Sequence, residues 1–289
     1  MTLFFIVTLN GLSLAALYFI AASGFSLVFG VMRVVNMAHG SLILLGAYVA
    51  FDVAEWSGSW VFGALAGSLA AALAGVLLQV LFFNRMAGKD LQQTLVSIAV
   101  SIIAADLMLA HWGGLTYQLN LPSLLEGSIG LPLLGVNYAK IRIVLIVAAI
   151  AVGVGLWLLM AKTNLGRLIR AGVDDQEMLH ALGFNVKGLF IAVFALGGAL
   201  AGFAGVVAAT ALSVSPGTDV QFLLAALIVV IVGGMGSIRG AAIGAVLVGL
   251  SEQYGLVYAP TYGVVFTFII MIGVLGFRPQ GLFGRGDVG

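Results

Sequence analysis

The chain has 289 residues, of which 62% are hydrophobic and 8% are charged, and its mean hydropathy is +1.19. Soluble domains carry about a quarter charged residues, so this composition excludes a water-soluble globule and makes lipid the main partner of the surface. The net charge of +1 argues against nucleic acid as a partner, and the absence of cysteine excludes disulfides and thiolate metal sites.

Hydrophobic stretches follow one another along the whole chain. A spanning helix needs about 20 apolar residues, and charged or polar turns predict ends near residues 30, 53, 83, 112, 161, 211, 236, 258 and 277. The first stretch, Leu3 to Gly30, contains no Lys or Arg, so we expect a retained span, tilted or begun by a surface helix, and no cleavable signal. The sequence predicts one all-α, polytopic transmembrane helix bundle over residues 1–289, with about 8–10 spans, broken or re-entrant helices being allowed.

The basic residues are distributed unevenly between the two sides. If about nine segments cross the membrane and the N-terminus is outside, ten of the twelve Lys and Arg residues fall on the cytoplasmic side, and only Lys140 and Arg142 fall outside. The stretch between His111 and Lys140 has one acid, Glu126, and no base, as expected for an external loop. The positive-inside rule therefore predicts an external N-terminus and a cytoplasmic C-terminus.

Small residues recur at four-residue spacing, which predicts close helix contacts in lipid. They are Gly63, Gly67, Ala71 and Gly75, then Gly198 and Gly202, then Gly236, Gly240 and Gly244.

Two apolar stretches are interrupted by glycine and polar residues, at Arg33–Ser41 and at Val232–Gly240. Unwound backbone inside a membrane is tolerated where it lines a cavity, so such interruptions in the two halves of a chain point to a substrate path. The alternative is that both are tight cytoplasmic turns. The candidate path residues are Asn36, His39, Gly40, Ser41, Gly233, Gly234, Met235, Gly236 and Ser237.

Three ionisable residues lie in or beside apolar segments: His39, Asp106 and Glu252. An ionisable group there is costly and is a functional candidate. A lone histidine at a membrane boundary is more often a hydrogen-bonded structural group than a proton relay, and we expect the two acids to reach the outer interface.

The richest charged stretch, at about residues 162–188, is predicted to contain a short amphipathic helix. Asp174 as N-cap with Glu177 three residues later resembles a capping box, and Gly183 suits a left-handed stop, which gives a helix of about two turns. Met178, Leu179 and Leu182 make one face apolar. This helix lies on lipid headgroups or docks on a partner protein, and its acids favour the partner.

Motifs for catalysis are absent from the sequence. It contains no phosphate-binding loop, dinucleotide fingerprint, nucleophile elbow or paired-histidine metal motif. We therefore expect no enzyme activity, no catalytic residue and no metal site on this chain, so any ATP hydrolysis belongs to another chain.

Several blocks of sequence, in order, resemble the branched-chain amino acid ABC permeases of the LivH type, over nearly the full chain. The blocks are Asn10-Gly11-Leu12, Gly24 to Val31, Asn36 to Gly40, Gly46-Ala47-Tyr48, Arg170-Ala171, Asp174-Asp175, Ala181-Leu182-Gly183, Gly197 to Gly205, Gly233 to Ser237 and Arg278 to Gly284.

The resemblance implies an importer in the bacterial inner membrane that moves branched-chain, hydrophobic amino acids by alternating access. It implies a second permease of the LivM type, two cytoplasmic ATPase subunits that use ATP and Mg, and a periplasmic or lipid-anchored substrate-binding protein. The family's coupling loop maps onto residues 170–187, with Arg170, Asp174, Asp175, Glu177, Met178, Ala181, Leu182 and Gly183 as candidate coupling residues. Alternatives are a permease for urea or short-chain amides, and a self-sufficient channel or ion-coupled carrier.

Overall fold

The computed structural model describes residues 2–131 and 136–284, and most of them are helical. The long or apolar helices are α1 (Thr2–Met32), α2 (His39–Ser57), α3 (Trp60–Leu81), α4 (Asp90–Trp112), α5 (Lys140–Lys162), α8 (Val186–Ala211), α9 (Thr218–Gly233), α10 (Ile238–Tyr258) and α11 (Gly263–Phe277). The short elements are α6 (Asn164–Asp174), α7 (Gln176–Ala181), the 3-10 turns η1 (Phe83–Arg85), η2 (Ser123–Leu125) and η3 (Pro260–Tyr262), and the strands β1 (Ser128–Leu131) and β2 (Val136–Ala139).

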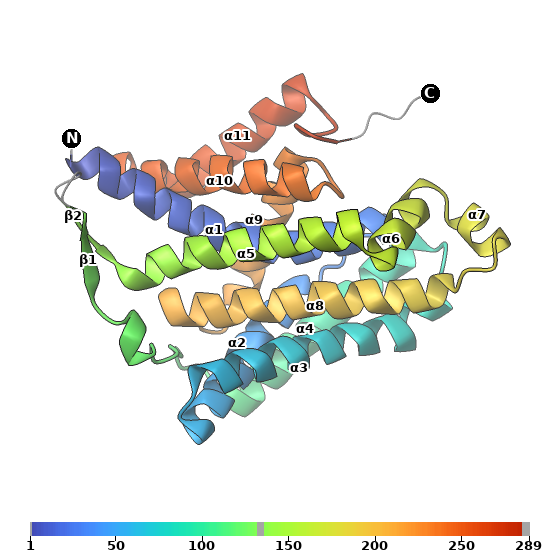
Figure 1. The fold of residues 1–289 in the computed structure, drawn as a ribbon, viewed down its shortest axis with the longest axis horizontal. Helices are drawn as coiled ribbons and strands as arrows, with labels where there is room; N and C mark the ends of the chain where they lie inside the picture. Colours follow the sequence, from blue (N-terminus) through green and yellow to red (C-terminus); the bar gives the residue numbers. More distant parts are fainter. Residues whose placement is uncertain (1, 132–135, 285–289) are drawn as a thin grey trace.

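The long helices run side by side along the long axis of the molecule (Figure 1). The N-terminus and the β1–β2 hairpin lie at one end, and α6, α7 and the C-terminal segment lie at the other. Helix α8 contacts α1, α2 and α3, whereas α10 contacts α1, α9 and α11. This is the all-α membrane bundle that the composition predicts.

Within the described residues, six helices are long and apolar enough to cross a membrane: α1, α3, α4, α5, α8 and α10. Helices α9 and α11 are apolar but shorter, and α2 carries two acids, Asp52 and Glu55. Together these nine helices match the nine predicted apolar segments. The first segment is one continuous helix of 31 residues without a separate surface helix.

The predicted small-residue faces lie at helix contacts. A Cβ atom at Gly67 would overlap the carbonyl oxygen of Gly46 in α2, and one at Gly198 would lie 2.6 Å from the carbonyl oxygen of Ala71 in α3. Backbones in lipid can approach this closely only when a side chain is missing. The four-residue spacing therefore identified the contact face of α3, and the structure shows that its partners are α2 and α8.

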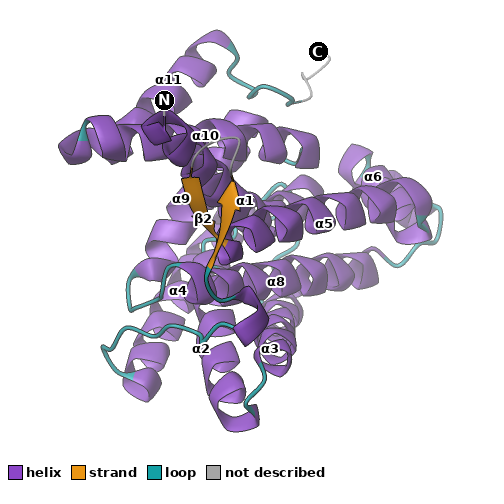
Figure 2. Cartoon of the chain, turned by 60° about the vertical axis from the view of Figure 1, so that its left-hand side comes forward, coloured by secondary structure: helices purple, strands orange, loops and turns teal. Residues whose placement is uncertain are grey.

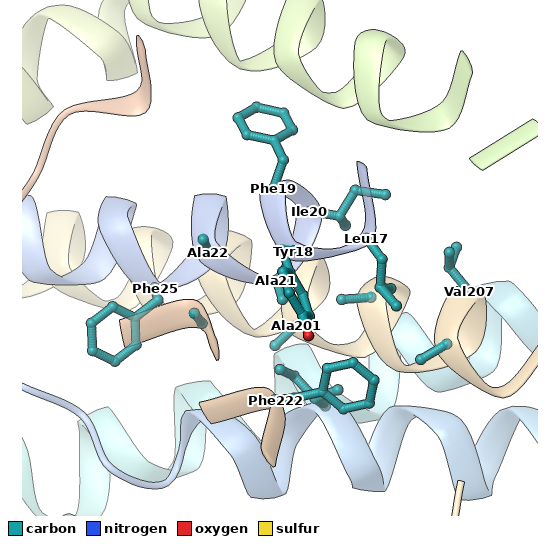
Figure 3. Packing of buried hydrophobic residues seen from close by; sticks show 14 of the residues in the cluster. Leu17, Tyr18, Phe19, Ile20, Ala21, Ala22, Phe25, Ala201, Val207 and Phe222 are labelled. Carbon is teal, nitrogen blue, oxygen red and sulfur yellow. The ribbon is translucent and has the colours of Figure 1, made fainter. Parts of the chain in front are cut away.

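Buried apolar residues form two clusters. The larger one joins α1, α2, α8, α9 and α10, and Figure 3 shows Leu17 and Ile20 of α1 near Val207 of α8 and Phe222 of α9. The smaller one, here the end cluster, consists of Leu27, Val28, Val31, Ala38, Leu78, Phe83, Ile169, Leu179, Leu189, Val193 and Phe194. The end cluster ties α6 and α7 to the main bundle.

The predicted external loop contains two short strands that the sequence analysis did not predict. Strands β1 and β2 pair antiparallel, with Ser128 opposite Ala139, and lie forward of the bundle in Figure 2. The hairpin is fixed to α1 because the Tyr138 and Ser13 hydroxyl oxygens lie 2.7 Å apart. Beside it, Arg142 donates a hydrogen bond to Asn10.

Candidate functional site

The first interruption returns into the bundle. Helix α1 ends at Met32, Arg33 adopts a left-handed φ of 56°, and residues 33–36 are not helical before α2 begins at His39. The His39 Nε2 atom lies 3.0 Å from the carbonyl oxygen of Ala21. Ala21 is eleven residues before Met32, a distance of about 16 Å along the helix. Helix α2 therefore starts inside the bundle and not at its end.

A polar stripe on α4 holds this re-entrant segment. The Ser97 hydroxyl accepts a hydrogen bond from the backbone N–H of Met37 at 3.0 Å, and the Ser41 and Ser101 hydroxyl oxygens also lie 3.0 Å apart. Ser97 and Ser101 are one helical turn apart on the same face of α4 as Gln93. This stripe was not predicted, although polar residues at positions 93, 97 and 101 of an apolar helix indicate a polar face.

His39 and Gly40 are enclosed by neighbouring helices. His39 is buried, and its ring packs edge-on against Phe25 with centroids 5.4 Å apart. A Cβ atom at Gly40 would overlap the carbonyl oxygen of Asp219 in the first turn of α9. The amino ends of α2 and α9, two of the shorter helices, thus meet inside the bundle. Interrupted helices whose ends meet inside a membrane are typical of transporter folds.

The second interruption is a tight turn between α9 and α10. Gly234 and Gly236 have φ of 105° and 80°, and Ser237 caps α10 by accepting the N–H of Gly240 at 3.0 Å. A Cβ atom at Gly234 would overlap the backbone nitrogen of Gly284. A Cβ atom at Gly233 would likewise overlap the carbonyl oxygen of Gly240. The Met235 side chain is exposed.

The C-terminal segment secures this turn. The backbone N–H groups of Leu282 and Phe283 donate to the carbonyl oxygens of Val232 and Gly233, both at 2.9 Å. These carbonyl groups belong to the last turn of α9, where no partner is available within the helix. Residues 278–284 resemble the permease family, but nothing in their sequence predicted this contact.

The second interruption touches α1 shortly before the first interruption begins. A Cβ atom at Gly30, near the end of α1, would lie 3.1 Å from the Cα atom of Gly236. The polar side chains do not converge, because His39 bonds to α1, Ser41 bonds to α4 and Ser237 caps α10. Asn36 accepts the N–H of Ala38, and its buried Nδ2 atom has no partner among the described residues. The assignment of these residues to a substrate path stays a prediction.

One acid lies close to the central core. The Tyr18 hydroxyl of α1 donates a hydrogen bond of 2.9 Å to the Glu252 carboxylate of α10, and Figure 3 shows the Tyr18 ring among core residues of α1 and α9. Asp106, in contrast, is exposed on α4. Among the residues that the structure describes, no three His, Cys, Asp or Glu side chains gather as a metal site would require.

The charged stretch folds as two helices, α6 and α7. The predicted N-cap is wrong by one residue: Asp174 ends α6, and the N-cap of α7 is Asp175, whose side chain accepts the N–H of Met178 at 2.8 Å. The third residue of α7 is then Met178 and not Glu177, so a reciprocal capping box cannot form. Asp174 is the last residue of α6, so it cannot be the N-cap of α7. Helix α6 itself was not predicted from the sequence.

The predicted stop at Gly183 is confirmed. Gly183 has a φ of 82°, its N–H donates to His180, and the N–H of Phe184 donates to Leu179. These two bonds define a Schellman motif, which glycine allows because it adopts a left-handed conformation without strain. Met178 and Leu182 are 57% and 67% exposed, whereas Leu179 is buried in the end cluster. Helix α7 thus presents apolar side chains outward from a fixed base.

Arg170, the first of the coupling candidates, is exposed but bonds back to the end of α5. Arg170 donates a hydrogen bond to the carbonyl oxygen of Met160 at the end of α5, and Ala181 is exposed in the last turn of α7. Nothing is described for the side chains of Asp174 and Glu177.

Arg33 connects α6 to the re-entrant segment. Its Nη2 atom donates a hydrogen bond of 3.1 Å to the carbonyl oxygen of Val173 in the last turn of α6. A cation is favourable at the carboxyl end of a helix. The end cluster makes a second connection, because it contains Ile169 of α6, Leu179 of α7 and Ala38, the residue before α2. These two contacts place α6 and α7 against the segment that precedes α2.

Comparisons with known proteins agree over nearly the whole chain. The family model for the permease component of the branched-chain amino acid transport system matches residues 7–275. The chain is 29% identical to the high-affinity branched-chain amino acid transport system permease protein BraD of Pseudomonas aeruginosa, and the match covers 96% of this chain and 95% of BraD. It is 28% identical to LivH of Escherichia coli K12 with the same coverage, and 27% identical to a probable LivH of Methanocaldococcus jannaschii, over 91% of this chain and 87% of that protein.

One solved structure is similar in fold. PsaBC from Streptococcus pneumoniae, in complex with Fab, superposes with a TM-score of 0.52 and 11% sequence identity. The superposition covers 95% of this chain and 92% of the matched chain. At this identity the similarity concerns the fold alone.

Proposed function

The chain belongs to the family of branched-chain amino acid transport permeases, and we propose that it is the membrane-spanning subunit of an ATP-binding cassette importer for branched-chain, hydrophobic amino acids. The family match over residues 7–275 is the observation that carries this proposal. The multi-pass helical bundle suits the role, because a permease needs helices that can form a path through lipid.

The proposal assigns energy and much of the selectivity to partner chains. The assembly contains a second, LivM-type permease, two cytoplasmic ATPase subunits that hold ATP and Mg, and a substrate-binding protein on the outside. Support comes from the sequence, which has no phosphate-binding loop, and from α7, where Met178 and Leu182 are exposed although apolar. Exposed apolar side chains on a fixed helix suit a protein interface better than water.

The proposed location is the bacterial inner membrane, with the N-terminus outside and the C-terminus in the cytoplasm. In this orientation ten of the twelve Lys and Arg residues fall on the cytoplasmic side and two fall outside, as the positive-inside rule requires. The arrangement is compatible with it, since α6, α7 and the C-terminal segment share one end of the bundle and the N-terminus lies at the other (Figure 1).

Coupling follows a physical route in this proposal. Closure of the ATPases on ATP displaces α7 and α6, and the displacement reaches Arg33 through its bond to Val173. The re-entrant segment then shifts, and with it the amino end of α2 where it meets α9. Because this junction lies inside the bundle, a small displacement there changes which side of the membrane the path faces.

Transport by the reconstituted complex tests the proposal. Proteoliposomes that contain both permeases and both ATPases, with the binding protein outside and ATP inside, should accumulate labelled L-leucine. Uptake that persists with a hydrolysis-deficient ATPase, or flux through this chain alone that an ionophore abolishes, would establish a channel or an ion-coupled carrier instead. Competition by urea or acetamide, with none by valine or isoleucine, would assign the path to those solutes.

A further inference from the structure

A pocket of about 320 Å³ opens at the end of the bundle that carries α6 and α7. It lies between the α3–α4 connection and the start of α8, and Met32, the last residue of α1 before the first interruption, lines one side of it. Pockets for small ligands span roughly 300–1,000 Å³, so this one suits a solute of amino-acid size. Its lining consists of Met32, Phe83, Asn84, Ala87, Gly88, Asp90, Gln93, His180, Val186, Lys187 and Phe190.

The pocket carries both signs of charge. Asp90, the first residue of α4, supplies a carboxylate, and Lys187, the second residue of α8, supplies an ammonium group. The two do not form a direct ion pair in the structure, so each is available to a ligand. The amino end of α8 adds to the attraction that Lys187 has for an anion. A ligand with one group of each sign would neutralise both.

A buried acceptor points to a donor on the ligand. Gln93 also lines the pocket and is 2% exposed, and its Nε2 atom donates to the carbonyl oxygen of Met86 at 2.7 Å. Its Oε1 atom has no hydrogen-bond partner among the described residues. A buried acceptor without a donor costs about 1–3 kcal/mol. An ammonium group held by Asp90 would supply the missing donor, because Asp90 and Gln93 lie one turn apart on α4.

The rest of the wall is apolar. Phe83 is buried, and Met32, Val186 and Phe190 are partly buried around the same space. An aliphatic side chain placed there would be removed from water without leaving a polar group unpaired. The pocket thus offers a cation for a carboxylate, acceptors for an ammonium group and an apolar wall for an aliphatic side chain. These are the features needed to bind a hydrophobic α-amino acid.

We propose that this pocket is a cytoplasmic regulatory site for a free hydrophobic α-amino acid, and that its occupation slows import. The ligand class rests on the proposed function, because the accumulated solute is then the ligand. In this site Lys187 binds the carboxylate of the ligand, and Asp90 and Gln93 bind its ammonium group. Phe83 and Phe190 contact the ligand's side chain.

The position of the pocket explains the inhibition. His180 belongs to α7, which carries the exposed apolar side chains for docking, whereas Phe83 and Asp90 belong to the main bundle. A ligand bound between them fixes α7 relative to α4. The displacement of α7 that ATP closure requires is then opposed, so each transport cycle slows as product accumulates.

Direct binding is the first test. Complexes of both permeases and both ATPases in nanodiscs, without the binding protein, are titrated with labelled L-leucine. We expect saturable binding that Asp90→Asn weakens about tenfold, since Asn still accepts a hydrogen bond but lacks the negative charge that strengthens it toward an ammonium group. Asp106→Asn, the same change on the exposed outer part of α4, is the matched control and should leave binding unchanged. Leucinamide and 4-methylpentanoate, each lacking one charge, should not compete.

Inhibition from the inside is the second test. Proteoliposomes with ATP inside and the loaded binding protein outside are preloaded with L-leucine or left empty. Preloading should slow initial uptake in the unaltered and Asp106→Asn complexes but not in Asp90→Asn or in Ala87→Trp, which fills the pocket from an exposed loop. Uptake from empty vesicles tests the proposed function separately. Normal uptake with no effect of preloading, or with the same inhibition in Asp90→Asn, would overturn the regulatory site alone.

Discussion

Replacing Arg33 by glycine separates two properties of this position, its left-handed backbone and its contact with α6. The φ of 56° is unusual for a residue with a Cβ atom, and Arg33 follows the last turn of α1, where its N–H bonds to Phe29 at 2.8 Å. Glycine adopts this conformation without strain. The Arg33→Gly variant should therefore keep the shape of the re-entrant segment and lose only the hydrogen bond to Val173.

The two effects nearly cancel in stability. A left-handed conformation costs a non-glycine residue about 1–2 kcal/mol, which Arg33→Gly recovers in part. The exposed charged hydrogen bond to Val173 contributes about 1 kcal/mol, and this is lost. We expect the melting temperature of the complex to change little. Coupling should nevertheless fall, since about 1 kcal/mol of coupling corresponds to roughly a fivefold change in an equilibrium constant.

The assay is the stimulation of ATP hydrolysis by the loaded binding protein. Basal hydrolysis and subunit association should be normal in Arg33→Gly, whereas stimulation should drop roughly fivefold. Arg33→Lys keeps a donor and should restore part of the stimulation, and Arg85→Asn controls for loss of a nearby positive charge. Full stimulation in Arg33→Gly at unchanged melting temperature would refute the route through Val173, and a large drop in melting temperature would refute the cancellation.

The remaining predictions concern the docking face, the second turn and the core. The double variant Met178→Asp, Leu182→Asp should prevent the ATPases from co-purifying. Phe283→Asp changes an exposed residue outside α7 and should not. Normal ATPase association in the double variant would contradict the docking role of α7. Gly234→Leu should stop transport in a complex that still assembles, because a side chain there overlaps Gly284. Gly155→Leu is the control, because nothing lies near Gly155. Equal uptake by the two variants would show that the turn is not needed for transport. Gly205→Leu should destabilise the bundle by about 3 kcal/mol or more, because it overlaps the carbonyl oxygen of Ile43; a melting temperature equal to that of Gly276→Leu would contradict this.

The spans and their contact faces were predictable because their signals are local. Apolar length fixes a membrane helix wherever the rest of the chain lies, and the spacing of Gly63, Gly67 and Gly75 marks a face before its partner is known. The cap of α7 was misplaced for the opposite reason. Asp174 and Asp175 are equally good caps by residue type, and the end of α6, stabilised by burial of Ile169, decides between them.

The candidate site was less predictable because it depends on contacts between distant residues. Met37 and Ser97 are 60 residues apart, as are Ser41 and Ser101. A glycine and polar interruption indicates that a helix breaks but not which way the chain then runs. The path of Arg33 to Ala38 back into the bundle follows from the polar stripe of α4, and no pattern within the interruption encodes it.

The backbone donors of the re-entrant segment determine which bonds the proposed displacement would break. The N–H of Met37 bonds to Ser97, that of Ala38 bonds to the Asn36 side chain, and that of His39 bonds to the Asn36 carbonyl oxygen. Two of these bonds are local and travel with the segment. The third depends on α4, whose side chains are largely exposed along the helix. If Arg33 pulls on the segment, its first part can therefore shift by exchanging the bond to Ser97, whereas His39 stays held by Ala21, so the displacement would bend the segment about the amino end of α2.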